Sequence, residues 1–180
     1  MPFHSPLSPP LHDRRAQILA LLADGRQPLT GGELSARLGV SRQVIVQDMA
    51  ILRAEGHDIV ATPRGYLMPE ANGPRGRRAV LACRHDASRV EEELCVMVDH
   101  GLMVVDVIVE HAFYGELRGN LMLCSRVDVG RFMARMSERR AQFLSALTGG
   151  VHLHTVEHAD QAAFDQAVAE LGRRGLLVTP

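Results

Sequence analysis

The sequence predicts a two-domain α+β protein, in which three helices and a hairpin precede a second α+β domain with a largely antiparallel sheet. Three observations support this division. Apolar residues recur at helical spacing up to about residue 55 and at strand-like spacing just after it. A stretch rich in Pro, Gly and Asn then follows at 69–78, which we interpret as a linker. Beyond it the order of patterns is β-α-β-β-α-β-α-β, which is compatible with a ferredoxin-like sheet.

Composition and charge indicate a globular protein with two unlike halves. Hydrophobic residues make up 46% of the chain and charged residues 23%. Because no apolar run reaches the roughly 18 residues that span a bilayer and no signal-peptide pattern opens the chain, we expect a cytoplasmic protein without a membrane partner. Residues 1–78 carry 10 Arg and 7 acidic residues, so their net charge is 10 − 7 = +3; residues 79–180 carry 10 Arg and 14 acidic residues, so theirs is 10 − 14 = −4. The basic half is the one expected to face phosphate.

The first domain is predicted at 11–68, after a Pro-rich start at 1–10 that we expect to be a disordered lead. A helical apolar stripe begins at Leu11 and is stopped by the pair Asp24-Gly25. This pattern predicts the first helix of the domain.

Two further helices are predicted from their caps. Thr30 is a good N-cap and Glu33 completes a capping box, and this helix ends at Gly39. Ser41 caps the next helix, which runs to about Glu55. Two helices joined by a tight Gly-containing turn are typical of a helix-turn-helix.

A hairpin after the third helix would complete a winged helix-turn-helix. The stretches 58–62 and 66–68 are rich in β-formers and flank a Pro-Arg-Gly turn. Guanidinium and carboxamide groups on the exposed face of the third helix can pair with purine edges, whereas other arginines hold phosphates. The predicted DNA-binding residues are Ser41, Arg42, Gln43, Gln47, Arg53 and Arg64. An alternative is that such a unit mediates protein interaction or dimerisation, with Arg42 and Gln47 merely solvated.

In the second domain, at 79–180, the feature that carries chemistry is the pair His152 and His154. Both belong to a predicted strand, and its period of two places their imidazoles on one face. Such a pair makes half of a first-row metal site. Further ligands are available from His85 and the acidic run 91–93, which follows Ser88, the expected cap of the first helix of this domain. Alternatively, the histidines are a pair at the surface or core edge, and the acidic run is a solvated first turn.

The three cysteines, Cys83, Cys95 and Cys124, are odd in number and lack CxxC spacing. They therefore predict neither a disulfide framework nor a zinc ribbon. We interpret them as buried, inert thiols.

Two resemblances cover nearly the whole chain. The stretch LTGGELSARLGVSRQVIVQDMAILRAEG resembles the biotin-repressor-type helix-turn-helix, although no ligase loop follows it. The second half resembles the three-histidine (3H) domain of niacin-responsive transcriptional repressors, the NiaR family. The matching stretches are HDASRVEEELCVMVDHG (85–101), VVDVIVEHAFYGELRGNLMLCSR (104–126) and SALTGGVHLHT (145–155).

The resemblance implies a homodimeric repressor that binds double-stranded operator DNA with nicotinic acid as corepressor and controls genes for NAD biosynthesis or niacin uptake. It implies a divalent transition metal, and this donor set suits nickel, zinc or iron. The implied ligands are His85, Glu93, His152 and His154. As contacts for the small ligand we consider Tyr114 and Arg118, which could hold its carboxylate, and His111. His111 is also an alternative metal ligand or a partner of one, and it could equally be a structural histidine.

Two other functions remain open at this stage. The metal itself could be the signal, without any response to niacin. Alternatively, a metallohydrolase tethered to DNA would need a general base, for which Asp86 or Glu92 could serve. No second acid/base pair accompanies the ligands, which counts against an enzyme.

Overall fold

A computed structural model describes residues 11–24, 28–69 and 76–178. The predicted lead at 1–10 and most of the predicted linker lie outside these residues. The chain divides into two compact units, one up to residue 71 and one from residue 72. Within the described residues, no helix combines the length and the apolar character that crossing a membrane requires.

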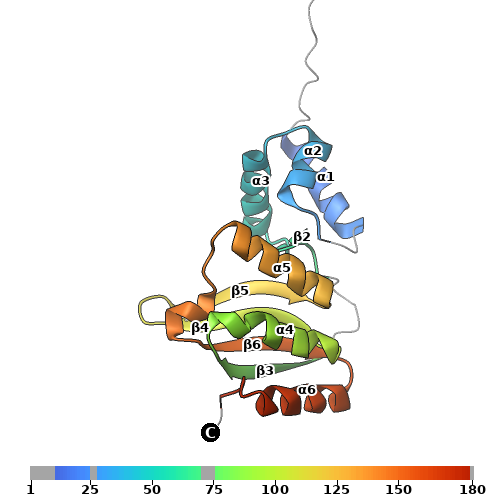
Figure 1. The fold of residues 1–180 in the computed structure, drawn as a ribbon. Helices are drawn as coiled ribbons and strands as arrows, with labels where there is room; N and C mark the ends of the chain where they lie inside the picture. Colours follow the sequence, from blue (N-terminus) through green and yellow to red (C-terminus); the bar gives the residue numbers. More distant parts are fainter. Residues whose placement is uncertain (1–10, 25–27, 70–75, 179–180) are drawn as a thin grey trace, which may run out of the picture. The chain divides into compact units, whose positions relative to one another are not determined.

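The first unit contains the three predicted helices and the hairpin (Figure 1). The elements are α1 (Leu11–Asp24), α2 (Gly31–Leu38), α3 (Arg42–Ala54), β1 (Val60–Thr62) and β2 (Gly65–Leu67). The two strands pair antiparallel, so the winged helix-turn-helix prediction is confirmed.

Local hydrogen bonds explain why the α2–α3 turn forms. The Thr30 side chain accepts from the backbone N–H of Glu33, and the Glu33 carboxylate accepts from the backbone N–H of Thr30 at 2.7 Å. Gly39 ends α2 with φ = 65°, a conformation that favours glycine. Ser41 then accepts from the backbone N–H of Val44 at 3.3 Å and starts α3.

The wing is anchored to the helices through Leu29. Its backbone exchanges two hydrogen bonds with Tyr66 of β2, at 2.9 and 2.8 Å. Gly65 must be glycine here, because it has φ = 133° and a Cβ would lie 2.5 Å from the Leu29 carbonyl. The position of the hairpin relative to α2 is therefore fixed by backbone contacts.

A buried ion pair joins α1 to α3. Arg14 donates to the Asp48 carboxylate through Nε at 2.6 Å and through Nη2 at 3.1 Å. Only 6% of Arg14 and 2% of Asp48 is exposed, within a core that includes Ile18, Ile45 and Met49. The bidentate geometry compensates much of the cost of removing both charges from water.

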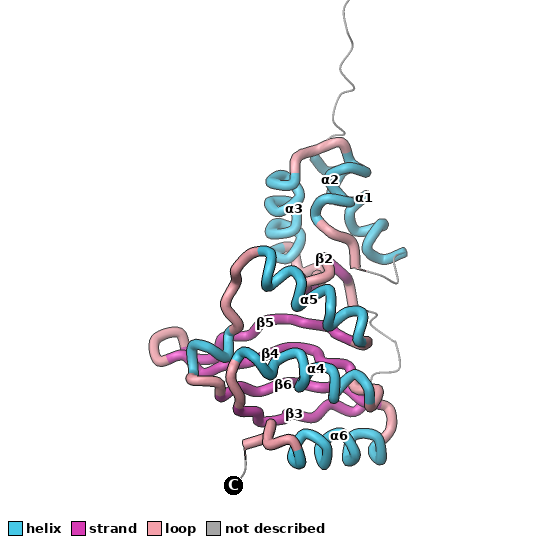
Figure 2. The backbone as a smooth tube through the Cα atoms, viewed as in Figure 1, coloured by secondary structure: helices cyan, strands magenta, loops and turns pink. Residues whose placement is uncertain are grey.

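The second unit is a four-stranded antiparallel sheet with helices on one face (Figure 2). The strand order is β3-β6-β4-β5, and α4 and α5 lie across the sheet while α6 lies beside β3. The elements are β3 (Arg77–Arg84), the 3-10 helix η1 (Ala87–Arg89), α4 (Val90–Asp99), β4 (Met103–His111), β5 (Gly115–Leu123), α5 (Arg126–Glu138), η2 (Leu144–Thr148), β6 (Val151–His158) and α6 (Gln161–Arg173).

The α+β class with an antiparallel sheet is confirmed, but the ferredoxin-like strand order is wrong. In that order the first and third strands of the domain are central, whereas here the central strands are the second and fourth, β4 and β6. The physical reason is burial. The outer strands β3 and β5 contain many exposed residues, which suits the edges of a sheet. In β6 every second residue is buried, and this strand has a neighbour on each side.

Two local predictions in this unit also need correction. Ser88 does not cap a helix; Asp86 caps η1 instead, accepting from the Ser88 backbone N–H at 2.8 Å. The predicted final strand from residue 176 is reduced, within the described residues, to a single bridge between Leu177 and Cys83. The helical segment begins upstream of the predicted cap at Ser88, because the Asp86 side chain accepts a hydrogen bond from a free backbone N–H group of η1.

The Arg14–Asp48 pair gives a stability prediction. Asp48→Ala should lower the free energy of unfolding of the first unit by about 3–5 kcal/mol, because it leaves a buried guanidinium unpaired. The matched control is Glu55→Ala, which removes the ion pair between Glu55 and Arg15. Because the Glu55 side chain is 47% exposed, this substitution should cost about 0–1 kcal/mol. Chemical denaturation followed by circular dichroism measures both. Equal losses of unfolding free energy in the two variants would show that the buried ion pair stabilises the first unit no more than the exposed one does.

Candidate functional site

The geometry of β6 confirms that His152 and His154 share one face. Residues 152, 154, 156 and 158 are the buried positions of this strand, and the two imidazoles are each 3% exposed. Their rings lie 4.9 Å apart between centroids, nearly perpendicular to one another. The turn before the strand is formed by Gly149 and Gly150, both with positive φ.

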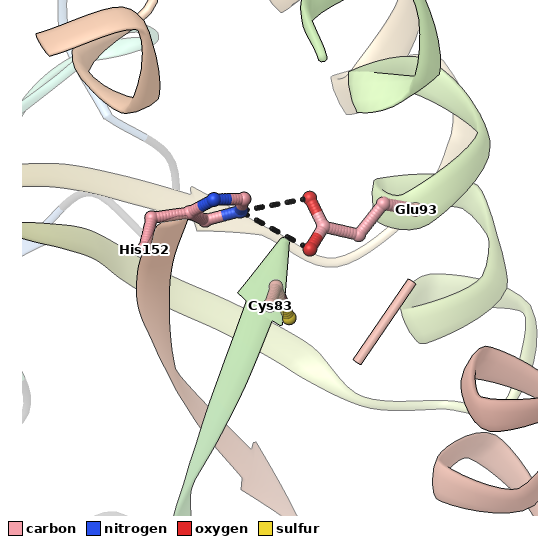
Figure 3. Close-up of side chains that lie close together, drawn as sticks. All are labelled: Cys83, Glu93 and His152. Atoms are coloured by element: carbon pink, nitrogen blue, oxygen red, sulfur yellow. Dashed lines mark hydrogen bonds and ion pairs between the residues drawn. The ribbon is translucent and has the colours of Figure 1, made fainter. Parts of the chain in front are cut away.

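His85 and Glu93 reach the same place from other elements. His85 follows the end of β3, and Glu93 lies in the first turn of α4 with 0% exposure. The Glu93 carboxylate oxygens lie 2.9 Å from His85 Nε2, 3.2 Å from His152 Nε2 and 3.3 Å from His154 Nε2. Figure 3 shows the His152 and Glu93 side chains pointing toward each other from β6 and α4. The structure thus brings together all four residues that the resemblance implied.

Each imidazole is oriented by its other nitrogen. The Nδ1 atoms contact backbone carbonyl oxygens: His85 that of Asp86 at 2.8 Å, His152 that of Gly150 at 2.9 Å, and His154 that of Asp106 at 2.7 Å. A carbonyl oxygen can only accept, so Nδ1 is the protonated nitrogen in each ring. Metal-binding histidines are commonly oriented in this way.

A neutral ring with a protonated Nδ1 presents a bare lone pair at Nε2. Three such lone pairs therefore face one carboxylate in a buried space, and protonating all three rings would bury three positive charges against one negative charge. The Nε2 of His85 accordingly has no well-directed hydrogen bond among the described residues, although it lies 2.9 Å from Glu93. A divalent cation satisfies all of these donors at once.

The separations fit a cation. Two ligand atoms, each about 2.1 Å from one ion, lie about 3.0 Å apart in an octahedron and about 3.4 Å apart in a tetrahedron. The nitrogen-to-oxygen distances of 2.9 to 3.3 Å fall in that range. The donor set of nitrogen and oxygen suits zinc, nickel or iron.

The electrostatics of the site favour the deprotonated carboxylate. Burial alone would raise the pKa of Glu93, but the three imidazole groups of His152, His154 and His85 around its carboxylate outweigh burial and hold this pKa well below its ordinary value. Burial alone would lower the pKa of His85, and the neighbouring Glu93 carboxylate reverses this and raises it. The carboxylate form of Glu93 is therefore the favoured one at neutral pH.

Sequence reasoning missed one residue of this cluster. Cys83 of β3 lies directly opposite His152 in the β3–β6 register, is 0% exposed, and places its sulfur within 4.8 Å of ligand atoms of both His152 and Glu93. The signal was present, because Cys83 and His85 are two residues apart at the end of one strand. The uniform interpretation of the cysteines as buried was also wrong, since Cys95 is half-buried and Cys124 exposed.

A cavity of about 210 Å³ adjoins the cluster on the side of α5 and η2. Its polar lining includes the site residues Glu93, His152 and His154, together with the uncharged Asn120, Gln142 and Ser145. The apolar walls come from Val90, Leu94, Val107, Leu121, Phe132, Met136, Phe143 and Leu144. The space is suited to a small, flat, mainly apolar molecule with one polar end toward the cluster.

The residues predicted to contact a small ligand lie elsewhere. Tyr114 is 77% exposed at the β4–β5 turn, where its ring lies 5.0 Å from that of His111. Arg118 donates to Asp106 at 2.6 Å and to Glu116 at 2.8 Å. None of the three predicted residues lines the cavity. Arg118 instead holds Asp106, whose backbone carbonyl orients His154.

The two acids considered as general bases are also occupied away from the cluster. The Asp86 carboxylate caps η1 and accepts from Ser88. Glu92 accepts from Arg89 at 2.9 Å and from Arg174 at 3.2 Å on the surface. The geometry offers neither of them to a substrate at the cluster.

On the first unit, the predicted reading surface is exposed. Arg42, Gln43 and Gln47 are exposed side chains of α3, and Ser41 is its N-cap. Val46 on the same helix is 43% exposed and was not predicted; an apolar side chain here could contact a thymine methyl group.

The two arginines predicted to hold phosphate differ from these. Arg53 donates through Nε to the Ile59 carbonyl at 2.7 Å, and its guanidinium lies 5.7 Å from the centre of the Tyr66 ring. It therefore connects α3 to the wing. Arg64 is half-buried in the turn between β1 and β2.

Comparisons with known proteins cover both units. Residues 14–67 match the model of an HTH domain, and residues 78–180 match that of the 3H domain. Transcription repressor NadR of Bacillus subtilis is 42% identical over 168 residues, which are 92% of this chain and 93% of that protein. Probable transcription repressor NiaR of Thermotoga maritima is 42% identical over 166 residues, which are 92% of this chain and 94% of that protein.

The two glycines before β6 offer a matched pair of substitutions. A Cβ at Gly150, where φ is 93°, would lie 2.3 Å from the His85 carbonyl oxygen, whereas a Cβ at Gly149, where φ is 61°, meets no atom within 4 Å. Gly149→Ala should cost about 1–2 kcal/mol of stability and leave metal affinity unchanged. Gly150→Ala should cost more and also weaken metal binding, because this turn positions His85 and His152. Thermal denaturation and metal titration measure both; equal behaviour of the two variants would contradict the proposed role of the turn.

Proposed function

The chain belongs to the family of NadR- and NiaR-type transcription repressors. We propose that it contains a metal, and that it binds operator DNA and represses transcription in response to nicotinic acid. The genes it controls would be those of NAD biosynthesis or niacin uptake. The observation that carries the proposal is the convergence of three Nε2 lone pairs and the Glu93 carboxylate beside an apolar cavity.

His85, Glu93, His152 and His154 would hold the ion. All four side chains are almost fully buried, and the three rings are already oriented by backbone carbonyls, so little rearrangement is needed for binding. The ion supplies a Lewis acid at the inner end of the cavity, where a carboxylate or a ring nitrogen could bind it.

Nicotinic acid matches the cavity in size and chemistry. It is a flat ring with a single carboxylate, and the cavity offers apolar walls such as Phe132, Phe143 and Leu121 around a polar inner end. Asn120 and Gln142 carry amide groups that can hydrogen-bond the end of the ligand that does not face the ion. These two residues replace His111, Tyr114 and Arg118 as our candidates for ligand contacts.

For repression, the ligand must favour one arrangement of two winged domains. A homodimer formed through the 3H domains would present two α3 helices to half-sites one helical turn of DNA, or a multiple of it, apart. The ligand can shift this equilibrium only by its differential affinity for the two arrangements. Operator DNA and a small metabolite are both met in the cytoplasm, where we place the protein.

The other candidate functions differ in their response to ligands. In a plain metal sensor, operator affinity would change with metal and not with nicotinic acid. The tethered hydrolase is disfavoured, because the relatives are named as transcription repressors and because Asp86 and Glu92 are occupied elsewhere. Titrating operator binding with the metal and with nicotinic acid separately distinguishes the three.

The site assignment is tested with a double substitution. His152→Ala with His154→Ala should abolish stoichiometric metal binding and the niacin response together, because half of the ligands are lost. The matched control is His158→Ala, which removes another buried histidine of β6 that instead stacks on Phe164. Elemental analysis and operator titration measure the two properties. Niacin-dependent repression that persists in the double variant would refute the assignment.

The DNA-binding surface is tested with variants of α3. Arg42→Ala and Gln47→Ala should each weaken operator binding by about 1–3 kcal/mol, with a smaller effect on unrelated DNA, if they read base edges. Arg53→Ala should mainly lower stability, because its guanidinium connects α3 to the wing. Fluorescence anisotropy at fixed salt provides the affinities. Equal losses on operator and unrelated DNA would reassign Arg42 and Gln47 to phosphate contacts.

A further inference from the structure

We propose that the Cys83 thiolate is an additional ligand of the cation held by His85, Glu93, His152 and His154. The inference rests on the proposed metal site and adds to it a soft donor from a different strand. It assigns a role to a buried residue that the sequence analysis set aside as an inert thiol.

The position of Cys83 in the sheet points toward the cluster. Its Cα is the register partner of His152, and side chains at paired positions of an antiparallel sheet lie on the same face. The residue is 0% exposed, so its sulfur is not available to solvent or to another protein. In Figure 3 the Cys83 sulfur lies beside the contact between His152 and the Glu93 carboxylate.

The distances permit a shared ion. The Cys83 sulfur and the ligand atoms of Glu93 and His152 all lie within 4.8 Å of one another. A sulfur and a nitrogen or oxygen bound to one ion, with bonds of about 2.3 and 2.1 Å, lie at most about 4.4 Å apart. Any remaining difference is a few tenths of an ångström, which a side-chain rotation can absorb.

A second observation is that one buried nitrogen of the cluster lacks a hydrogen-bond partner among the described residues. The His85 Nε2 is a buried polar atom without a hydrogen bond among the described residues, and its side chain is 1% exposed. This atom lies 2.9 Å from the Glu93 carboxylate. The same carboxylate is also within 4.8 Å of the Cys83 sulfur. The cysteine is therefore one of several donors around a space that only a cation can satisfy.

Charge balance explains what the thiolate contributes. A divalent ion with three neutral imidazoles and one carboxylate carries a net charge of +1 among buried side chains, and buried net charge is costly. Replacing the S–H bond by a metal–sulfur bond releases one proton to solvent and adds one negative charge to the site. The loaded cluster then has no net charge, and no electron transfer is needed.

The experiment uses Co²⁺ as the probe, because a thiolate bound to Co²⁺ gives a charge-transfer band in the near ultraviolet that imidazole and carboxylate ligands do not. The full-length chain is titrated with Co²⁺, alongside Cys83→Ser and a control in which Cys95→Ser and Cys124→Ser are combined. We expect the band in the unmodified chain and in the control, and its loss in Cys83→Ser with a roughly 10- to 100-fold lower Co²⁺ affinity. Calorimetry in buffers of different ionisation enthalpy should find about one proton fewer released by Cys83→Ser.

The outcomes separate the inference from the function beneath it. Stoichiometric Co²⁺ binding that depends on His152 and His154, without the band and unchanged in Cys83→Ser, overturns the sulfur ligand and leaves the proposed metal site intact. Failure of the unmodified chain to bind Co²⁺, Ni²⁺ or Zn²⁺ overturns both. If Cys83→Ser does not fold, X-ray absorption on the unmodified zinc-loaded chain decides, because a sulfur scatterer at about 2.3 Å must be present.

Discussion

The second domain depends on one constraint: three imidazoles, each with its hydrogen fixed on Nδ1, meet a single buried carboxylate. Backbone carbonyls of residues 86, 106 and 150 set the orientation of the three rings, so the lone pairs cannot turn away from Glu93 without breaking these contacts. Among buried side chains, such a cluster of electron pairs is unfavourable unless a positive charge occupies its centre. The same feature that makes the cluster costly for a metal-free protein is the reason for proposing a divalent ion at this place.

The strand order brings the members of this cluster together. β6 carries the two inward imidazoles and is central, so it has β3 on one side, which supplies Cys83 and leads to His85, and β4 on the other, which supplies the Asp106 carbonyl. α4 then lies over the sheet and brings Glu93 down onto the same point. Four elements thus meet at one place: β3, β6 and β4 are held there by the backbone hydrogen bonds of the sheet, and α4 by the apolar packing of Val90, Leu94 and Met97.

How much could be predicted from the sequence depended on whether the determinant was local. The capping box at Thr30 and the turn at Gly39 involve neighbours in the chain, and the shared face of His152 and His154 follows from the strand period. Glu93 needed the resemblance, because an acidic first turn is usually solvated, yet its helical spacing from Val90 and Met97 places it on the buried face of α4. The strand order, the Arg14–Asp48 pair and the contribution of Cys83 result from long-range pairings that no local pattern specifies.

The placement of the donors also explains why a ligand could act at this ion. Glu93, His152 and His154 line the cavity, whereas His85 and Cys83, on the β3 side of the cluster, do not. An ion held between the residues that line the cavity and those on the β3 side would be covered by β3 and accessible from the cavity. A small anion in the cavity would therefore approach a metal ion from the side of Glu93, His152 and His154. In the proposed metal site, the negative charge of such an anion would add to that of the Glu93 carboxylate and of a Cys83 thiolate. Because β3 is the first strand of the second unit, it is the element of the proposed site that is nearest in sequence to the first unit.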